Sequence, residues 1–236
     1  MESIFLSLII PAYNEESRIS GSLDKALEYF SRQDYSWEII VVDDGSTDQT
    51  ARIIENYNAK NPNITLIKQV NIGKGSAVRN GMLAAHGKYR VFTDADFSTP
   101  IYELEKILPI LSAGTDICIG SRSIDRSMVK EHQPFYREWM GKTFNKFVQL
   151  LVFKGIVDTQ CGFKGFTASA AERIFSQAKI NGFSFDVEVL FLAKLGKMTI
   201  KEVPIEWYND ERSKVNPISD STRMFLELIK IRRLHK

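Results

Sequence analysis

Short apolar runs alternate with amphipathic stretches along the first half of the chain. The compact apolar runs are typical of buried strands and lie at 4–10, 37–42, 64–69 and 89–93. Apolar residues recur at helical spacing in the segments between these runs. Two predicted helices lie at 17–31 and 75–86, and another starts after a cap at Ser46 or Thr47 and ends at about residue 60. This alternation predicts an α/β fold with a mostly parallel, Rossmann-like sheet and helices on both faces.

The second half of the chain is less regular. It predicts a helix at 103–113, a strand at 116–120, a polar loop at 123–134 and an amphipathic helix at 135–153. We therefore expect one domain made of two halves, residues 1–122 and 123–236, with an amphipathic helical appendage at the C-terminal end.

Polar motifs follow three of the predicted strands directly. They are Pro11 to Glu16, Asp43 to Ser46 and Asp94 to Ser98. In open sheets of this kind, ligands bind outside the carboxyl ends of the strands. The three motifs are therefore expected to form one site on one edge of the sheet.

Asp94 and Asp96 stand two residues apart after an apolar run, so both side chains leave the same face of a strand. Such a pair repels, and a divalent cation that bridges to a phosphate would offset the repulsion. Mg²⁺ and Mn²⁺ suit these hard oxygen ligands. The simpler interpretation of an isolated Asp-x-Asp is the start of a solvated loop.

Composition and charge limit the classes of protein to which the chain could belong. The chain has 236 residues, 44% hydrophobic and 25% charged content, and a net charge of +2, which does not suggest a nucleic-acid binder. Its two cysteines fit a reducing compartment. The N-terminus lacks the basic segment of a signal peptide, and no apolar run approaches the roughly 18 residues of a membrane span. We expect a cytoplasmic protein that lies on a membrane surface if it works at one.

The order and spacing of the motifs resemble those of family 2 glycosyltransferases with the GT-A fold. The matching segments are 11–16, 41–46, 71–75 and 94–96. Segments in the second half are similar to those of polyprenyl-phosphate glycosyltransferases, above all the dolichyl-phosphate β-glucosyltransferases; they are 158–166, 185–188, 203–207, Ser213-Lys214 and 219–225. The resemblance implies inverting, metal-dependent transfer of glucose from UDP-glucose to a polyprenyl phosphate, dolichyl or undecaprenyl.

The same resemblance implies roles for individual residues. The first half would bind the nucleotide sugar through Pro11, Ala12, Tyr13, Glu15, Asp43, Asp44, Lys74, Arg79 and Asp94. The metal would be held by Asp96, with Asp94 and Ser98 nearby; related mannosyltransferases have Gln where this chain has Ser98. The second half would bind the acceptor phosphate through Arg122, Arg137 and Lys164, and Asp96, Arg122 and Lys164 would be the catalytic residues.

Each local pattern also has a plainer interpretation. On its own, Asp43 to Ser46 is more typical of a tight turn with a helix cap, and Glu15 is also consistent with an acidic residue at a helix N-terminus. Arg137 is also consistent with a solvated charge. The segment 135–153 suits either an interfacial helix or a core helix, and the basic segment 223–236 either a lipid-facing or a solvated helix.

Several other functions share these features. A related glycosyltransferase would use GDP-mannose, UDP-N-acetylglucosamine or UDP-galactose, or a polysaccharide acceptor. A nucleotidyltransferase would normally carry a Gly-rich loop with Arg near the N-terminus, where this chain has Pro-Ala-Tyr-Asn-Glu-Glu. A non-catalytic sensor would bind the sugar nucleotide and leave it intact. The sequence does not indicate an oligomeric state.

Overall fold

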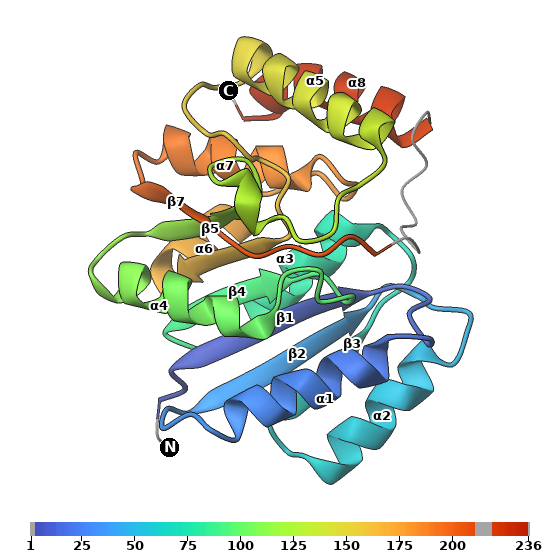
Figure 1. Cartoon of the computed structure of the whole chain (residues 1–236). Helices are drawn as coiled ribbons and strands as arrows, with labels where there is room; N and C mark the ends of the chain where they lie inside the picture. Colours follow the sequence, from blue (N-terminus) through green and yellow to red (C-terminus); the bar gives the residue numbers. More distant parts are fainter. Residues whose placement is uncertain (1–2, 211–218, 236) are drawn as a thin grey trace.

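The computed structural model of the chain describes residues 3–210 and 219–235, with backbone alone at 219–222. Ser213 and Lys214, which contributed to the family resemblance, lie outside the described residues. A seven-stranded sheet runs through the molecule in the order β3-β2-β1-β4-β6-β5-β7 (Figure 1). The strands are β1 Leu6–Ala12, β2 Trp37–Asp43, β3 Ile64–Lys68, β4 Tyr89–Thr93, β5 Ile117–Ser121, β6 Phe163–Thr167 and β7 Ile200–Pro204.

The sheet is mostly parallel, as the sequence predicts. Among the described strands, only β6 runs against its neighbours, β4 and β5. The other pairs, β1 with β2 and β4, β2 with β3, and β5 with β7, are parallel. The carboxyl ends of β1, β2 and β4 therefore meet at one edge.

Helices cover both faces of this sheet. The helices are α1 Ile19–Phe30, α2 Thr50–Lys60, α3 Lys74–Ala84, α4 Leu104–Ser112, α5 Phe135–Leu151, α6 Ala168–Phe175, α7 Phe185–Leu195 and α8 Ser219–Leu234, with 3₁₀ turns η1 Ile101–Glu103 and η2 Arg126–Met128. Buried side chains of α1, α2 and α4 pack on one face of the sheet, and those of α3, α6 and α7 on the other. Both layers derive their stability from apolar faces removed from water.

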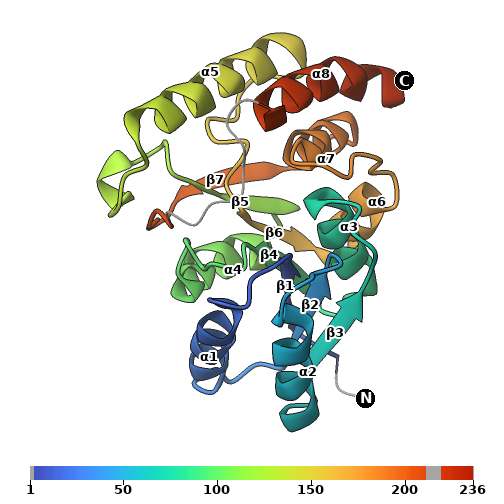
Figure 2. The ribbon, with the colours of Figure 1, turned by 90° about the vertical axis from the view of Figure 1, so that its right-hand side faces the viewer.

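Helices α5 and α8 form an outer layer beyond α7 (Figures 1 and 2). Leu228 and Ile231 of α8 are fully buried against the core, and the ring of Phe225 meets that of Phe147 on α5 edge-on, with 5.1 Å between centroids. These two helices are the amphipathic appendage that the sequence predicts.

The start of α2 differs from the prediction. Neither Ser46 nor Thr47 caps this helix, which begins at Thr50. The Ser46 hydroxyl instead accepts from the Asn14 amide at 2.9 Å, and the Thr47 amide donates to the Asn14 side chain at 2.8 Å. Asp48 accepts from the Thr50 amide at 2.9 Å. The predicted capping residues thus join the loops that follow β1 and β2.

Candidate active site

The three strand-end motifs come together around a cavity of about 790 Å³. The nucleotide-binding candidates that line it are Pro11, Ala12, Tyr13, Glu15, Asp44, Lys74 and Asp94, together with Asp96. The Asp44 amide donates to the carbonyl of Ala12 at 2.8 Å, which joins the ends of β1 and β2 directly. The cavity thus lies where the parallel strands end, as this sheet type favours.

The structure separates Asp43 from Asp44, both of which the family resemblance assigns to nucleotide binding. The Asp44 carboxylate lines the cavity and accepts from the amides of Ile72 at 3.0 Å and Gly73 at 2.9 Å. Asp43 is buried and accepts from the Ser46 amide at 3.3 Å, as expected of a turn. Asp44 is therefore the carboxylate at the cavity wall, and it also holds the turn before α3.

Lys74 begins α3 and reaches the carboxylate of Asp94, with 2.5 Å between Nζ and Oδ1. Burial opposes its charge, but Asp94 and Asp186 outweigh that effect and raise the pKa of Lys74. The ammonium is therefore held in its charged form between two carboxylates.

Glycine is required on both sides of Lys74. Gly73 adopts a positive φ of 125°, and a side chain there would meet the Asn181 carbonyl at 2.5 Å. At Gly75, a Cβ would lie 2.5 Å from the Ile180 carbonyl. The Gly-Lys-Gly turn thus allows the loop around residues 180–182 to approach the start of α3.

Arg79 lies away from this turn. Its guanidinium donates to the Ala178 carbonyl at 3.2 Å, and the residue does not line the cavity. Five residues beyond Lys74 on α3, the side chain points to a different part of the helix surface. The structure therefore does not bring Arg79 to the cavity where the sequence leads us to expect it.

The pair Asp94 and Asp96 carries an electrostatic cost. Burial and the charge of Asp94 together raise the pKa of Asp96, although the Ser98 amide donates to its carboxylate at 2.9 Å. Asp96 also lies near Arg18, with 3.7 Å between Oδ2 and Nη1. Its ionised form therefore needs further positive charge.

A divalent cation fits this arrangement. Within residues 3–210 and 219–235, no cluster of three or more His, Cys, Asp or Glu side chains could hold a metal. Mg²⁺ commonly binds through one or two carboxylates and completes its shell with water and substrate phosphates. Asp94 and Asp96 match that pattern, and Ser98 adds a hydroxyl beside Asp96.

Arg18 is a member of this site that the sequence analysis missed. Its guanidinium pairs with both carboxylate oxygens of Glu15 and lies 3.2 Å from Asp210. At the sequence level it looks like a solvated cation before an amphipathic helix. Its role depends on Asp210, which is remote in the chain, so no local pattern could reveal it.

A second cavity, of about 730 Å³, adjoins the first. The two share wall residues Lys74, Asp94, Asp96, Phe183 and Met224. Gly162 lines the second cavity and lies directly against Asp94, because a Cβ at this position would be 2.1 Å from an Asp94 oxygen. The carboxylate pair thus stands at the junction of the two cavities.

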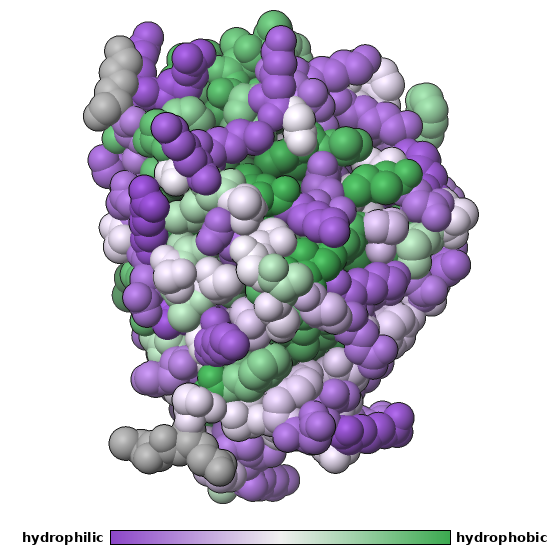
Figure 3. Space-filling view, turned by 90° about the vertical axis from the view of Figure 1, so that its left-hand side faces the viewer, coloured by the Kyte–Doolittle hydropathy of each residue, from purple (hydrophilic) through white to green (hydrophobic). Residues whose placement is uncertain are grey.

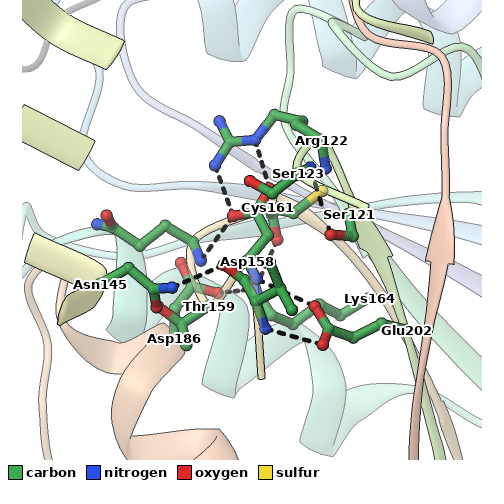
Figure 4. Close-up of polar contacts among 12 residues, drawn as sticks. Ser121, Arg122, Ser123, Asn145, Asp158, Thr159, Cys161, Lys164, Asp186 and Glu202 are labelled. Atoms are coloured by element: carbon green, nitrogen blue, oxygen red, sulfur yellow. Dashed lines mark hydrogen bonds and ion pairs between the residues drawn. The ribbon is translucent and has the colours of Figure 1, made fainter. Parts of the chain in front are cut away.

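Arg122 and Arg137 line the second cavity, together with Ser98. Arg122 is held by Asp158 through two side-chain contacts of 2.8 Å (Figure 4). Burial would raise the pKa of Asp158, but Arg122 overcomes this and lowers it. The ring of Trp207 lies 5.6 Å from the guanidinium carbon of Arg122. Arg122 is therefore a fixed cation at the end of β5.

Lys164 does not reach either cavity. It lies on β6 between β4 and β5 and is fully buried, and its ammonium donates to the Cys161 carbonyl and to Asp186, each at 2.5 Å (Figure 4). Asp186 in turn lines the second cavity. In this structure Lys164 thus supports the cavity wall from beneath, and direct contact with an acceptor phosphate would require it to leave Asp186.

Two neighbouring groups behave as structural residues. Burial raises the pKa of the Cys161 thiol to about 12, which excludes an activated nucleophile at neutral pH. Glu188 lies on α7 and accepts from the amides of Lys179 at 2.9 Å and Ile180 at 2.8 Å. Glu188 therefore positions the loop that leads to Asn181.

Comparisons with known proteins identify a family and several relatives. The sequence model of glycosyl transferase family 2 matches residues 7–175. The chain is 40% identical to dolichyl-phosphate beta-glucosyltransferase of Dictyostelium discoideum over 98% of this chain and 75% of that protein. It is 36% identical to the human protein of the same name over 96% of this chain and 74% of that protein.

A similar fold occurs among solved structures. Glucosyl-3-phosphoglycerate synthase from Mycobacterium tuberculosis, in complex with Mn²⁺, uridine diphosphate and glucosyl-3-phosphoglycerate, superposes with a TM-score of 0.71. The match covers 97% of this chain and 80% of that one at 16% sequence identity. At this identity the likeness establishes a shared fold.

Proposed function

The chain belongs to glycosyl transferase family 2, and we propose that it transfers glucose from UDP-glucose to the phosphate of a polyprenyl lipid. The observation that carries the proposal is the junction of two cavities at Asp94 and Asp96, one lined by nucleotide-binding candidates and the other by Arg122 and Arg137. Relatives at 34–40% identity are dolichyl-phosphate beta-glucosyltransferases, which supports a glucosyl donor and a lipid phosphate acceptor.

The first cavity would hold the donor. The half-exposed ring of Tyr13 can stack on the base, and the carboxylates of Glu15 and Asp44 can accept from ribose hydroxyls or base N–H groups. Lys74, together with the backbone amides at the start of α3, favours the diphosphate because a helix N-terminus attracts anions. This places the diphosphate beside Asp94 and Asp96.

Asp94 and Asp96 would hold Mg²⁺ or Mn²⁺, with Ser98 close to Asp96. Bound there, the cation neutralises charge on the departing diphosphate as a Lewis acid. Asp96 provides an ionised oxygen ligand, and Lys74 adds a second positive charge at the same place.

The second cavity would hold the acceptor phosphate against Arg122 and Arg137. One phosphate oxygen attacks the anomeric carbon of glucose, a C–O bond forms, and the bond to the UDP oxygen breaks with inversion. The phosphate is already ionised near neutral pH, so no strong general base is required. Rate enhancement then comes from positioning and from cations around the diphosphate.

The outer helices would rest on the membrane that holds the lipid. Hydrophobic and hydrophilic side chains mix at this end of the molecule, the top of Figure 3. Large exposed apolar side chains on α5 and α8 are Phe135, Tyr136, Trp139, Phe147, Leu150, Leu226, Ile229 and Leu234. Exposed lysines and arginines on the same helices would attract anionic lipid. None of the helices in the described part of the chain has the length and apolarity to cross a bilayer.

A donor panel tests the proposal. Thermal unfolding with Mg²⁺ and UDP-glucose, UDP-galactose, UDP-N-acetylglucosamine or GDP-mannose should show the largest stabilisation with UDP-glucose, since a ligand stabilises the state that binds it. Greater stabilisation by GDP-mannose would show that the donor is GDP-mannose and not UDP-glucose. Stabilisation without any sugar transfer to lipid or soluble acceptors would indicate a sensor.

A further inference from the structure

Buried polar atoms without hydrogen-bond partners gather in the donor cavity. Six such side-chain atoms occur among the described residues, and three belong to residues that line this cavity: Arg18, Asn181 and Glu227. Arg18 already lies near two carboxylates. Asn181 Oδ1 and Glu227 Oε2 are acceptors, and a buried acceptor without a donor is costly.

The two acceptors come from segments that lie close together. A Cβ built on Gly182 would lie 3.3 Å from Oε1 of Glu227, so the loop that carries Asn181 runs directly against that carboxylate. Glu227 is on α8, one helical turn from Met224, which lies where the donor and acceptor cavities meet. The pair therefore faces the donor cavity next to the reacting region.

Asn181 is fixed by its own backbone. Its carbonyl accepts from the Gly75 amide at 2.7 Å, and Glu188 holds the two amides before it, at Lys179 and Ile180. The backbone of Asn181 is therefore held in place at the cavity wall, and its buried side-chain oxygen is not used by the fold. Such preorganisation is what a binding group requires.

Helix α8 is attached at both ends. The Ser184 hydroxyl donates to the Met224 carbonyl at 3.3 Å, and the His235 ring lies 2.6 Å from Glu188. Lys179 also donates to the Leu234 carbonyl at 2.9 Å. Glu227 is therefore held over the cavity by contacts on either side of it along the helix.

We propose that Glu227 and Asn181 form a hydroxyl-binding subsite for the sugar nucleotide. A carboxylate and an amide oxygen accept from vicinal hydroxyl groups, whereas a diphosphate would be repelled by Glu227. The hydroxyls belong either to the transferred hexose or to the ribose, because both sugars present the same chemistry. The subsite rests on the proposed function and adds a specificity role to the C-terminal helix.

Titration calorimetry with the full-length protein and Mg²⁺ tests this subsite. Ligands are UDP-glucose, UDP and 2′-deoxy-UDP, and variants are Glu227→Gln and Asn181→Ala. If the subsite binds the hexose, both variants should lower the affinity for UDP-glucose by about tenfold or more and leave the affinity for UDP unchanged. If the subsite binds the ribose, the variants should lose affinity for UDP as much as for UDP-glucose. The preference that the wild type shows for UDP over 2′-deoxy-UDP should then disappear in the variants.

Two controls make the outcome decisive. Glu105→Gln removes the same charge from an exposed position on α4, outside both cavities, and should bind all ligands as the wild type does. Thermal unfolding of each variant shows that it is folded. Wild-type affinity of both variants for all three ligands would overturn the subsite. Failure of the wild type itself to bind any uridine ligand would instead overturn the proposed function.

Discussion

Arg122 and Asp158 form a two-point ion pair at the wall of the second cavity. Nε and Nη2 of Arg122 each lie 2.8 Å from a different carboxylate oxygen, and the Arg122 amide donates to the same Asp158 group at 2.9 Å. Such planar, bidentate contacts fix the orientation of a guanidinium. The position of Arg122 is therefore set before any phosphate arrives.

Asp158→Asn tests this pair through stability. The change leaves a partly buried guanidinium without its charge partner, so the free energy of unfolding should fall by about 1–3 kcal/mol in urea titrations at neutral pH. Asp34→Asn, at an exposed position, serves as the control and should change it by less than about 0.5 kcal/mol.

The same pair has a defined pH dependence. Because the folded pKa of Asp158 lies below its ordinary value of 3.8, its contribution is present above that value and is lost as pH falls through the folded pKa. The difference between wild type and Asp158→Asn should therefore stay constant from about pH 7 to 5 and narrow only in stronger acid. A difference that disappears already between about pH 7 and 5 would contradict the account.

Asp96→Asn should uncouple stability from metal binding. Burial and Asp94 raise the pKa of Asp96, so ionisation costs stability in the metal-free protein, and this cost appears as pH rises through the raised pKa. The neutral variant should melt at the same or a higher temperature than the wild type at neutral pH. It should also lose the stabilisation that Mn²⁺ and UDP together give the wild type; retention of that full shift would exclude Asp96 as a ligand.

Lys74→Gln should move two affinities in opposite directions. The variant leaves Asp94 without its ammonium partner, so Mn²⁺ alone should bind more tightly. The diphosphate loses a cationic partner, so the affinity for UDP should fall by about tenfold or more. Calorimetry with each ligand separately measures both; weaker binding of both ligands would argue for a general loss of structure.

Two glycine substitutions on helices form a matched pair. Gly75→Ala places a Cβ 2.5 Å from the Ile180 carbonyl and 2.6 Å from the Phe185 Cβ, and it should destabilise the fold by about 1–3 kcal/mol and weaken UDP binding. Gly141→Ala on α5 meets nothing within 4 Å and should stabilise by about 0.5–1 kcal/mol. Similar effects of both changes in denaturant titrations would contradict the close approach at Gly75.

The proposed membrane contact would depend on exposed apolar residues of the outer helices. Trp139→Glu combined with Leu150→Glu should reduce co-sedimentation with anionic vesicles severalfold, because both side chains are more than half exposed on α5. Val70→Glu changes a similarly exposed position outside α5 and α8 and should not reduce it. Equal loss in both proteins would place the contact elsewhere.

The sequence predicts the parallel core of this fold well, because each strand there is a compact apolar run followed by an amphipathic helix. Strand β6 is not predicted in this way. It runs antiparallel to its neighbours, and the sequence analysis treats its segment as part of a family motif. That position explains why Lys164, expected at the acceptor phosphate, is buried beside Asp186. A side chain of a central strand with covered faces has no route to the surface.

The candidate site also contains residues that the sequence predicts and residues that it does not. Residues at strand ends, such as Asp44, Lys74 and Asp96, reach the cavity because the sheet itself places them there. Arg18 and Glu227 could not be predicted, because Arg18 meets Asp96 and Asp210 as well as its neighbour Glu15, and Glu227 meets the loop at Gly182, all but Glu15 being distant in sequence. Local patterns report on elements, whereas these contacts depend on how the C-terminal part folds back over the sheet.

The most direct test is transfer of labelled glucose. Full-length protein with Mg²⁺ and radiolabelled UDP-glucose is incubated with vesicles that contain a polyprenyl phosphate, and the label is partitioned between lipid and water. The account predicts label in the lipid phase, lost without the polyprenyl phosphate and reduced by at least about a hundredfold in Asp96→Asn. Label confined to a soluble acceptor, or equal lipid labelling by Asp96→Asn, would contradict it.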